Sequence, residues 1–154
     1  GVTVKYKQVT LSAFFHGRFG QSIVNMARMN NESMFGSNNQ SKAVLRRWKN
    51  EGDNTDIPRA LYNEGRNYLG SDRFVEKASF VRLKSMTLSY GFPRKICNRF
   101  NVNSLSVFVT GYNLFTWTNY TGQDPEVSVK DNLAIDTATT PVAKRFSFGL
   151  NMSF

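Results

Sequence analysis

The sequence predicts an all-β fold, an antiparallel meander that forms the last strands of a large transmembrane β-barrel and carries long extracellular loops. Three observations predict it. Residues 146–154 alternate apolar with small or polar side chains, as a strand does when lipid covers one face and water the other. The 154 residues include 13 Phe, yet the mean hydropathy is −0.40. No run of 18 apolar residues occurs in the sequence, which excludes a transmembrane helix.

The predicted closing strand spans residues 145–154. One parity holds Phe146, Phe148, Leu150, Met152 and Phe154, and the other holds Ser147, Gly149, Asn151 and Ser153. A strand that crosses a bilayer needs about 9–11 tilted residues with lipid outside and a polar lumen inside. An edge strand of a soluble protein can alternate similarly, but it seldom ends on an unprotected Phe. We therefore interpret this segment as a barrel strand.

Four further strands are predicted, near residues 1–6, 9–20, 79–91 and 104–117. The first begins abruptly, and we expect it to be the tail of a strand whose start lies upstream. The turns at 7–8 and 92–103 are short, whereas the segments at 24–78 and 118–145 are long and rich in turn residues. Because outer-membrane barrels have short periplasmic turns and long extracellular loops, we assign the two long segments to the extracellular side.

The strand predicted at 79–91 changes its polarity halfway along. Met86, Leu88 and Tyr90 share one face, but earlier in the strand Val81 and Leu83 have the opposite parity. A single soluble sheet does not normally change polarity in this way. We interpret the change as a wall that projects above the bilayer, where its outer surface becomes wet.

The loop at 24–78 is expected to be irregular apart from one short helix, residues 42–49. Ser41 or Asn39 would be its N-cap, and Gly52 would end it. At the strand ends, Tyr90, Trp117 and Tyr120 are expected to lie in the aromatic girdles that flank an apolar band.

Five strands do not close a membrane barrel, because an open sheet leaves edge amides and carbonyls unsatisfied in lipid. Even the smallest closed barrels use about eight strands. The chain, residues 1–154, is therefore expected to be the C-terminal portion of something larger. The alternative is a soluble β-sandwich module that binds carbohydrate through its aromatic residues.

The formal charge of +9 raises the question of nucleic-acid binding. Residues 24–78 are nearly balanced, with nine basic and seven acidic residues, whereas 79–103 hold five basic residues and no acidic one. This excess sits at strand ends and in a turn, where anionic lipid head groups attract it. We expect no nucleic-acid partner. A single cysteine, Cys97, excludes an internal disulfide and a cysteine zinc cluster.

Three blocks resemble one family. They are residues 72–84 leading into 86–93, residues 107–127, and Trp48 with 52–53 and 55–59. In these blocks and in its Phe terminus, the chain resembles the SusC/RagA-type TonB-linked outer-membrane proteins of Bacteroidetes. The resemblance implies a barrel of about 22 strands with a plugged lumen, located in the outer membrane of a Gram-negative bacterium.

The resemblance also implies a function and partners. Members of the family import glycans or peptides, with a SusD-like surface lipoprotein as a lid and energy from the TonB system. We expect the plug and the TonB-contacting segment to lie outside this chain. No cofactor is expected. The sequence shows no nucleophile–base pair, phosphate-cradling Gly loop or paired catalytic carboxylates, so we do not predict an enzyme.

The end of the chain also resembles the signal that the barrel-assembly machinery recognises, at Ser147, Gly149, Met152 and Phe154. An exposed strand edge pairs through its backbone, and aromatic anchors set the register. We expect Phe154 to be needed for insertion rather than for transport.

A contact patch is predicted at Arg46, Arg47, Trp48 and Lys49. One interpretation is a solvated helix face in which Trp48 anchors the loop. The other is contact with the lipoprotein lid or with lipid phosphates.

The remaining polar candidates favour structural roles. His16 has no second His or Cys partner for a metal site, so we expect an imidazole that faces the lumen or solvent. Asp124 and Glu126 could form a cation or glycosidase site, but a turn at Asp124-Pro125 is expected instead. Asp53 and Asp56, beside Arg59, are expected to make local hydrogen bonds and ion pairs rather than a calcium site.

Overall fold

A computed structural model describes residues 1–61, 63–65, 70–127, 129–130 and 133–154. Parts of both predicted loops, residues 62, 66–69, 128 and 131–132, lie outside the described residues. The chain divides into two compact units. The sheet unit comprises Gly1–Phe19, Ser79–Thr118 and Val142–Phe154, and the loop unit comprises Gly20–Ala78 and Asn119–Pro141.

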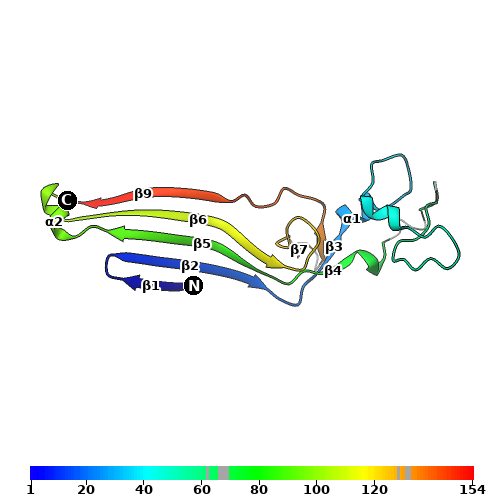
Figure 1. Cartoon of the computed structure of the whole chain (residues 1–154), viewed down its shortest axis with the longest axis horizontal. Coiled ribbons are helices and arrows are strands. Elements are labelled where there is room, and N and C mark those ends of the chain that lie inside the picture. The colour runs from blue at the N-terminus through cyan, green and yellow to red at the C-terminus, as the bar shows by residue number, and fades with distance from the viewer. Residues whose placement is uncertain (62, 66–69, 128, 131–132) are drawn as a thin grey trace. The chain divides into compact units, whose positions relative to one another are not determined.

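The sheet unit is one five-stranded antiparallel sheet (Figure 1). Its strands, in spatial order, are β1 (Val2–Tyr6), β2 (Val9–Arg18), β5 (Phe80–Gly91), β6 (Ser104–Thr118) and β9 (Arg145–Ser153). Consecutive strands of this sheet are hydrogen-bonded neighbours, so the predicted antiparallel meander is confirmed. Its five predicted segments match these strands to within one or two residues.

The register aligns apolar residues across all five strands. Val4 pairs with Leu11, Leu11 with Leu88, Leu88 with Val109, and Val109 with Phe148. The flanking rows contain Tyr6, Val9, Tyr90, Val107 and Leu150 on one side, and Val2, Ala13, Met86, Gly111 and Phe146 on the other. Since partners in a row point to the same side of a sheet, these three rows form one continuous surface, which we call the apolar face.

A β-bulge lies at Lys84 of β5. On β2 the consecutive residues Phe14 and Phe15 pair with Ser85 and Leu83, which leaves Lys84 as an extra residue. The pairing of β5 with β6 shifts at the same place. One extra residue moves every side chain beyond it to the other face.

The bulge explains the change of polarity in this strand. Beyond it Leu83 pairs with Phe15, and Val81 pairs with Trp117, so Val81 and Leu83 rejoin the apolar face. Arg82 is turned to the opposite side. The change of parity was therefore wrongly attributed to a water-exposed outer wall. It comes from the bulge at Lys84, and it keeps the apolar face continuous.

The connection between β5 and β6 contains the short helix α2 (Arg94–Arg99), where a simple turn was predicted. Pro93 precedes it with φ −66°, and its carbonyl accepts from the amides of Ile96 and Cys97. The Cys97 side chain is buried. Asn101, with φ +53°, reverses the chain in the left-handed conformation that Asn tolerates. The connection between β1 and β2 is the predicted turn at Lys7-Gln8.

The loop unit is more ordered than predicted. It contains a four-stranded sheet in the order β4 (Val75–Lys77), β3 (Ser22–Asn25), β8 (Leu133–Asp136) and β7 (Val129–Lys130). β3 pairs in parallel with β8, over a sequence separation of more than 100 residues. The expectation of an irregular loop at 24–78 was therefore wrong, and the segment at 118–145, expected as a long loop, contributes β7 and β8 to this sheet. These strands are two to four residues long, too short for alternation to reveal.

The described part of the loop unit also contains the short helices α1 (Met26–Asn31), η1 (Lys42–Arg46) and η3 (Asp72–Phe74). η1 confirms the start of the predicted helix, because the Ser41 hydroxyl caps it by accepting from the Ala43 amide. It is a 3₁₀ helix that ends at Arg46, before the predicted end. Two buried clusters form the core, one of Ile23, Ala78, Tyr120 and Ala134, the other of Met34, Val44 and Ile57.

Within the described residues, none of the helices has the length and apolar character needed to cross a membrane.

Candidate functional site

The apolar face is exposed rather than covered. Phe148 is 79% exposed, Leu150 is 57% exposed and Val4 is 57% exposed. In a β-sandwich these side chains would be enclosed by a second sheet. Their exposure across five neighbouring strands disfavours the soluble sandwich alternative, because an apolar patch of this extent marks contact with another apolar phase.

The dimensions of the apolar face fit a bilayer. On β6 it extends from Leu105, the partner of Met152, to Trp117, about 40 Å along the strand at about 3.3 Å per residue. A strand tilt of about 40° converts this length to about 30 Å of height, enough to span the apolar band of about 25 Å of outer-membrane barrels.

Aromatic residues lie toward both ends of this face. Trp117 is 55% exposed, and its ring lies 6.1 Å from that of Phe115 and 6.5 Å from that of Phe15. Toward the other end, the Tyr90 ring meets that of Phe92 edge-on at 5.2 Å. Two of the three predicted girdle residues, Trp117 and Tyr90, thus belong to the apolar face.

Tyr120 does not fit the girdle prediction. It lies beyond β6 in the loop unit, where it is 6% exposed and packs in the cluster with Ile23 and Ala134. Its hydroxyl donates a 2.7 Å hydrogen bond to Asp136. Burial, followed by the hydrogen bond to this carboxylate, raises the pKa of Tyr120 well above its usual range. The side chain is therefore a core residue of the loop unit.

The opposite side of the five-stranded sheet, which we call the polar face, carries small hydroxyl residues in its middle. Ser12, Thr87, Thr110 and Ser147 form one row, and the Thr87 and Thr110 hydroxyls are 2.9 Å apart. Arg82 is buried on this face, and its Nε donates to the Thr116 hydroxyl at 2.9 Å. The predicted lumen-facing residue His16 pairs with Arg82 in the register and packs on Phe80 at 5.8 Å.

The four residues of the predicted assembly signal divide between the two faces. Met152 belongs to the apolar face, and Ser147 and Gly149 to the polar face. A Cβ atom at Gly149 would overlap the ring of Phe108, its partner on β6. Gly149 therefore has a packing role within the sheet. Phe154 follows the end of β9 and is 82% exposed.

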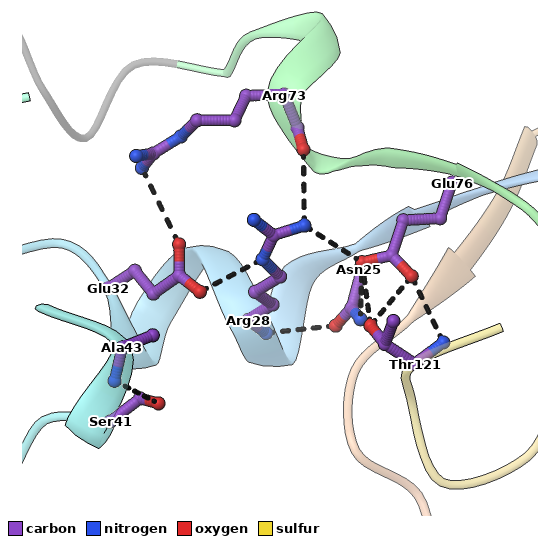
Figure 2. A network of polar contacts seen from close by, with 8 residues as sticks. All are labelled: Asn25, Arg28, Glu32, Ser41, Ala43, Arg73, Glu76 and Thr121. Atoms are coloured by element: carbon purple, nitrogen blue, oxygen red, sulfur yellow. Dashed lines mark hydrogen bonds and ion pairs between the residues drawn. The ribbon is translucent and has the colours of Figure 1, made fainter. Parts of the chain in front are cut away.

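A network of charged and polar groups holds the loop unit together (Figure 2). Arg28 donates from Nε to Glu32 at 2.9 Å and from a terminal nitrogen to Glu76 at 3.2 Å. Glu76 also accepts from the amide and the hydroxyl of Thr121 and from the Asn25 side chain. The Asn25 side chain caps α1 by accepting from the Arg28 amide at 2.9 Å.

The network sets the charge state of its members. Burial acts to raise the pKa of Glu76, but the hydrogen bonds from Thr121, Arg28 and Asn25 outweigh it, so the pKa lies below its ordinary value of 4.5. Burial likewise opposes the charge of Arg28, yet Glu32 and Glu76 hold its pKa above the usual value. Among the described residues, three buried side-chain atoms make no hydrogen bond: Glu32 Oε2 and the two terminal nitrogens of Arg73. One of these nitrogens, Nη2, forms an ion pair with Glu32 Oε2 at 3.9 Å.

A cavity of about 620 Å³ lies beside this network. Its lining includes the polar side chains of Asn25, Arg28, Glu32, Arg46 and Asp136. The volume is in the range of small-molecule sites. The mixture of guanidinium, amide and carboxylate groups suits a ligand with several hydrogen-bonding groups.

The predicted contact patch is only partly accessible. Arg46 and Lys49 are exposed, whereas Arg47 and Trp48 are partly buried. The Trp48 amide donates to the Ile57 carbonyl at 2.8 Å, so the backbone joins this segment to residue 57. Arg46 also lines the cavity.

The remaining acidic candidates make local bonds. One Asp53 oxygen accepts from the amides of Lys49 and Asn50, both at 2.9 Å, and these bonds lower the pKa of Asp53. Asp124 accepts from the Glu126 amide at 2.8 Å, as predicted for a turn. The part of the chain that the structure describes holds no group of three or more His, Cys, Asp or Glu able to bind a metal.

The sequence analysis missed the network around Arg28 and Glu76. One local signal was available, since Arg28 and Glu32 are four residues apart, the spacing at which side chains meet on a helix. The contacts of Glu76 with Arg28 and with Thr121 join residues 48 and 45 positions apart, and no local pattern predicts them.

Comparisons with known proteins agree with this architecture. No family model matches the chain. The TonB-dependent receptor P3 of Formosa agariphila is 30% identical over 98% of the chain, and the TonB-dependent receptor P26 of the same organism is 28% identical over 99%. Over nearly its whole length, the chain is similar to a segment of TonB-dependent receptors. It spans about 15% of the length of P3 and 16% of that of P26.

Solved structures support the same assignment. The RagAB peptide transporter superimposes with a TM-score of 0.80 and 27% identity, over 97% of this chain and 16% of the other. The RagAB peptide importer in its open-open state gives a TM-score of 0.77 at 26% identity, with the same coverage. The predicted SusC/RagA-type resemblance is thereby confirmed.

Proposed function

We propose that this chain forms part of the wall of an outer-membrane barrel that imports peptides with energy from the TonB system. The observation that carries the proposal is the continuous, exposed apolar face of the sheet, opposite a face of hydroxyl and charged side chains. Such a two-sided sheet separates lipid from a water-filled lumen. The similarity to the RagAB peptide transporter favours peptides over glycans as cargo.

The sheet has two open edges among the described residues, β1 and β9. Unpaired edge groups cost several kcal/mol each in lipid. The proposal therefore requires further strands of the full-length receptor on both sides. A plug and a TonB-contacting segment would come from the same receptor.

Site-directed spin labelling tests the two faces. Leu150→Cys and Asn151→Cys differ by one position on β9, and Cys97→Ala removes the native thiol of this segment. In the full-length receptor in lipid vesicles, we expect a nitroxide at position 150 to collide mainly with oxygen and one at 151 mainly with a water-soluble nickel complex. Equal accessibility of the two positions would contradict the lipid-facing assignment.

The transport function has its own test. Cells that carry the full-length receptor should accumulate a short fluorescent peptide, and deletion of the TonB system should abolish the accumulation. Uptake that persists without TonB, or uptake of oligosaccharides but not of peptides, would refute the proposed function.

The SusD-like lipoprotein lid is part of the proposal, with the exposed side chains of Arg46 and Lys49 as its contact. Replacing both by Gln should weaken co-purification of the lid with the full-length receptor. The matched variant Arg94→Gln/Lys95→Gln on α2 removes the same charge from the sheet unit and should leave it unchanged.

We further propose that Phe154 serves barrel assembly, because it is exposed and follows the last strand. Deleting Phe154 from the full-length receptor should lower its level in the outer membrane, measured by immunoblot of membrane fractions, while the molecules that insert retain uptake. An unchanged level would remove the assembly role.

A further inference from the structure

The two units of the chain differ sharply in charge. The sheet unit holds ten of the 20 Lys and Arg residues and no Asp or Glu. The loop unit holds the other ten basic residues together with all 11 acidic ones. The net charge of +9 therefore comes from the sheet unit, whose own sequence supplies no carboxylate side chain to balance it.

Several of these basic residues belong to the polar face. Arg18, Arg82 and Arg145 have the parity opposite to the apolar face on β2, β5 and β9, as does Lys5 on β1. Arg145 is exposed, with its guanidinium 4.6 Å from the centre of the Tyr112 ring. The polar face thus carries positive charge on four of its five strands.

The three arginines lie toward the end of the sheet from which the chain continues into the loop unit. Arg18 pairs with Phe80 at the start of β5, and Arg145 starts β9. Beyond them one row is small and uncharged, with Ser12, Thr87 and Ser147, and the next row holds Lys5 and Phe108. The three arginines are therefore followed by a hydroxyl row.

The basic residues of the polar face create a positive electrostatic potential. A surface of one sign, walled by a low-dielectric medium, focuses the field and raises the local concentration of the opposite charge, with gains of about 10- to 1,000-fold in association rate. Lipid against the apolar face supplies such a medium. The polar face should therefore attract anions and repel cations.

We propose that the polar face of the sheet binds and guides an anionic oligopeptide, so that the receptor prefers acidic over neutral peptides. This inference rests on the proposed function for the class of cargo, a peptide. It adds the sign of the charge, which follows from the basic residues of the polar face.

The test compares two fluorescent peptides that differ only in Glu against Gln. Binding to the purified full-length receptor is measured by fluorescence anisotropy, and uptake is measured in cells. At low ionic strength we expect the wild-type receptor to favour the Glu peptide by about 10-fold. Raising the salt concentration should reduce the preference, because the Debye length falls from about 30 Å at 0.01 M to about 8 Å at 0.15 M.

Three double variants identify the charges responsible. Arg18→Gln/Arg145→Gln should lower the preference to about 3-fold or less, whereas Arg18→Lys/Arg145→Lys, which keeps the charge, should retain it. Arg94→Gln/Lys95→Gln removes two exposed charges at the α2 end of the sheet unit and should also retain it. Membrane levels of all variants are compared by immunoblot, so that a folding defect is recognised.

Each outcome separates this inference from the proposed function. TonB-dependent uptake with equal rates for the two peptides would leave the import function standing and refute the charge preference. A charge preference in binding without uptake of either peptide would refute import but support the anionic site. An equal loss of preference in the α2 variant would show that net charge, and not the polar face, is responsible, and would overturn the inference.

Discussion

Replacing Phe148 by Arg tests the lipid-facing surface most directly. Phe148 ends the row that begins at Val4, near the middle of the apolar face, and is 79% exposed. If lipid covers it, the substitution places a guanidinium in hydrocarbon, at a cost of about 2–4 kcal/mol near the bilayer midplane.

The lost phenyl ring adds to this cost. Full transfer of a Phe side chain from water to an apolar phase is worth about 1.5–3 kcal/mol, and its 79% exposure scales this to about 1–2 kcal/mol. Together the two contributions predict a loss of about 3–6 kcal/mol in the free energy of unfolding. At about 1.4 kcal/mol per factor of ten, the equilibrium ratio of folded to unfolded receptor falls by about two to four orders of magnitude.

The assay is guanidinium unfolding of the full-length receptor in lipid vesicles, followed by tryptophan fluorescence. Asn151→Arg is the control, because Asn151 is exposed on the polar face of the same strand and the new charge would meet water. We expect a change within about 0.5 kcal/mol for it, as for ordinary surface substitutions. Equal losses for the two variants, or no loss for Phe148→Arg, would refute the assignment of lipid to the apolar face.

Three further predictions concern packing and the loop unit. Glu76→Gln should make the loop unit less stable above about pH 4.5 and should remove part of its acid sensitivity, both measured by hydrogen exchange across the pH range. The pKa of Glu76 is lowered in the folded state. Its contribution to stability is therefore present above the unfolded pKa and is lost as the pH falls through the folded pKa. Tyr120→Phe should cost about 1.5–3 kcal/mol in local opening free energy, also by hydrogen exchange, because it removes the hydrogen bond to the buried carboxylate of Asp136. Gly149→Ala should lower the thermal midpoint of the receptor, because the new Cβ overlaps the ring of Phe108.

Each of these has an outcome that would contradict it. A Glu76→Gln receptor with the pH profile of the wild type would show that the network does not stabilise the charged carboxylate. Unchanged exchange of the β8 amides in Tyr120→Phe would argue against the buried hydrogen bond. For Gly149, the variant Phe108→Ala/Gly149→Ala should recover part of the loss, and strict additivity of the two substitutions would exclude the steric cause.

Much of the sheet unit could be predicted from the sequence. Alternation at Phe146, Phe148 and Leu150 is a relation between near neighbours, and it identifies a strand with one apolar face without knowledge of its partners. The same holds for capping and turn residues, since Ser41 and Asp124 bond to amides two residues away. Interactions between near neighbours of this kind can be predicted from the sequence.

The tertiary structure decided the rest. Whether Val81 and Leu83 belong to the apolar face depends on the bulge at Lys84, which exists only in relation to the strands on either side. Tyr120 looked like a girdle residue beside Trp117, yet its bond to Asp136 places it in a core. The strand alternation followed from residues one or two positions apart, whereas register, burial and the contacts of Glu76 followed from segments that meet only when the chain has folded.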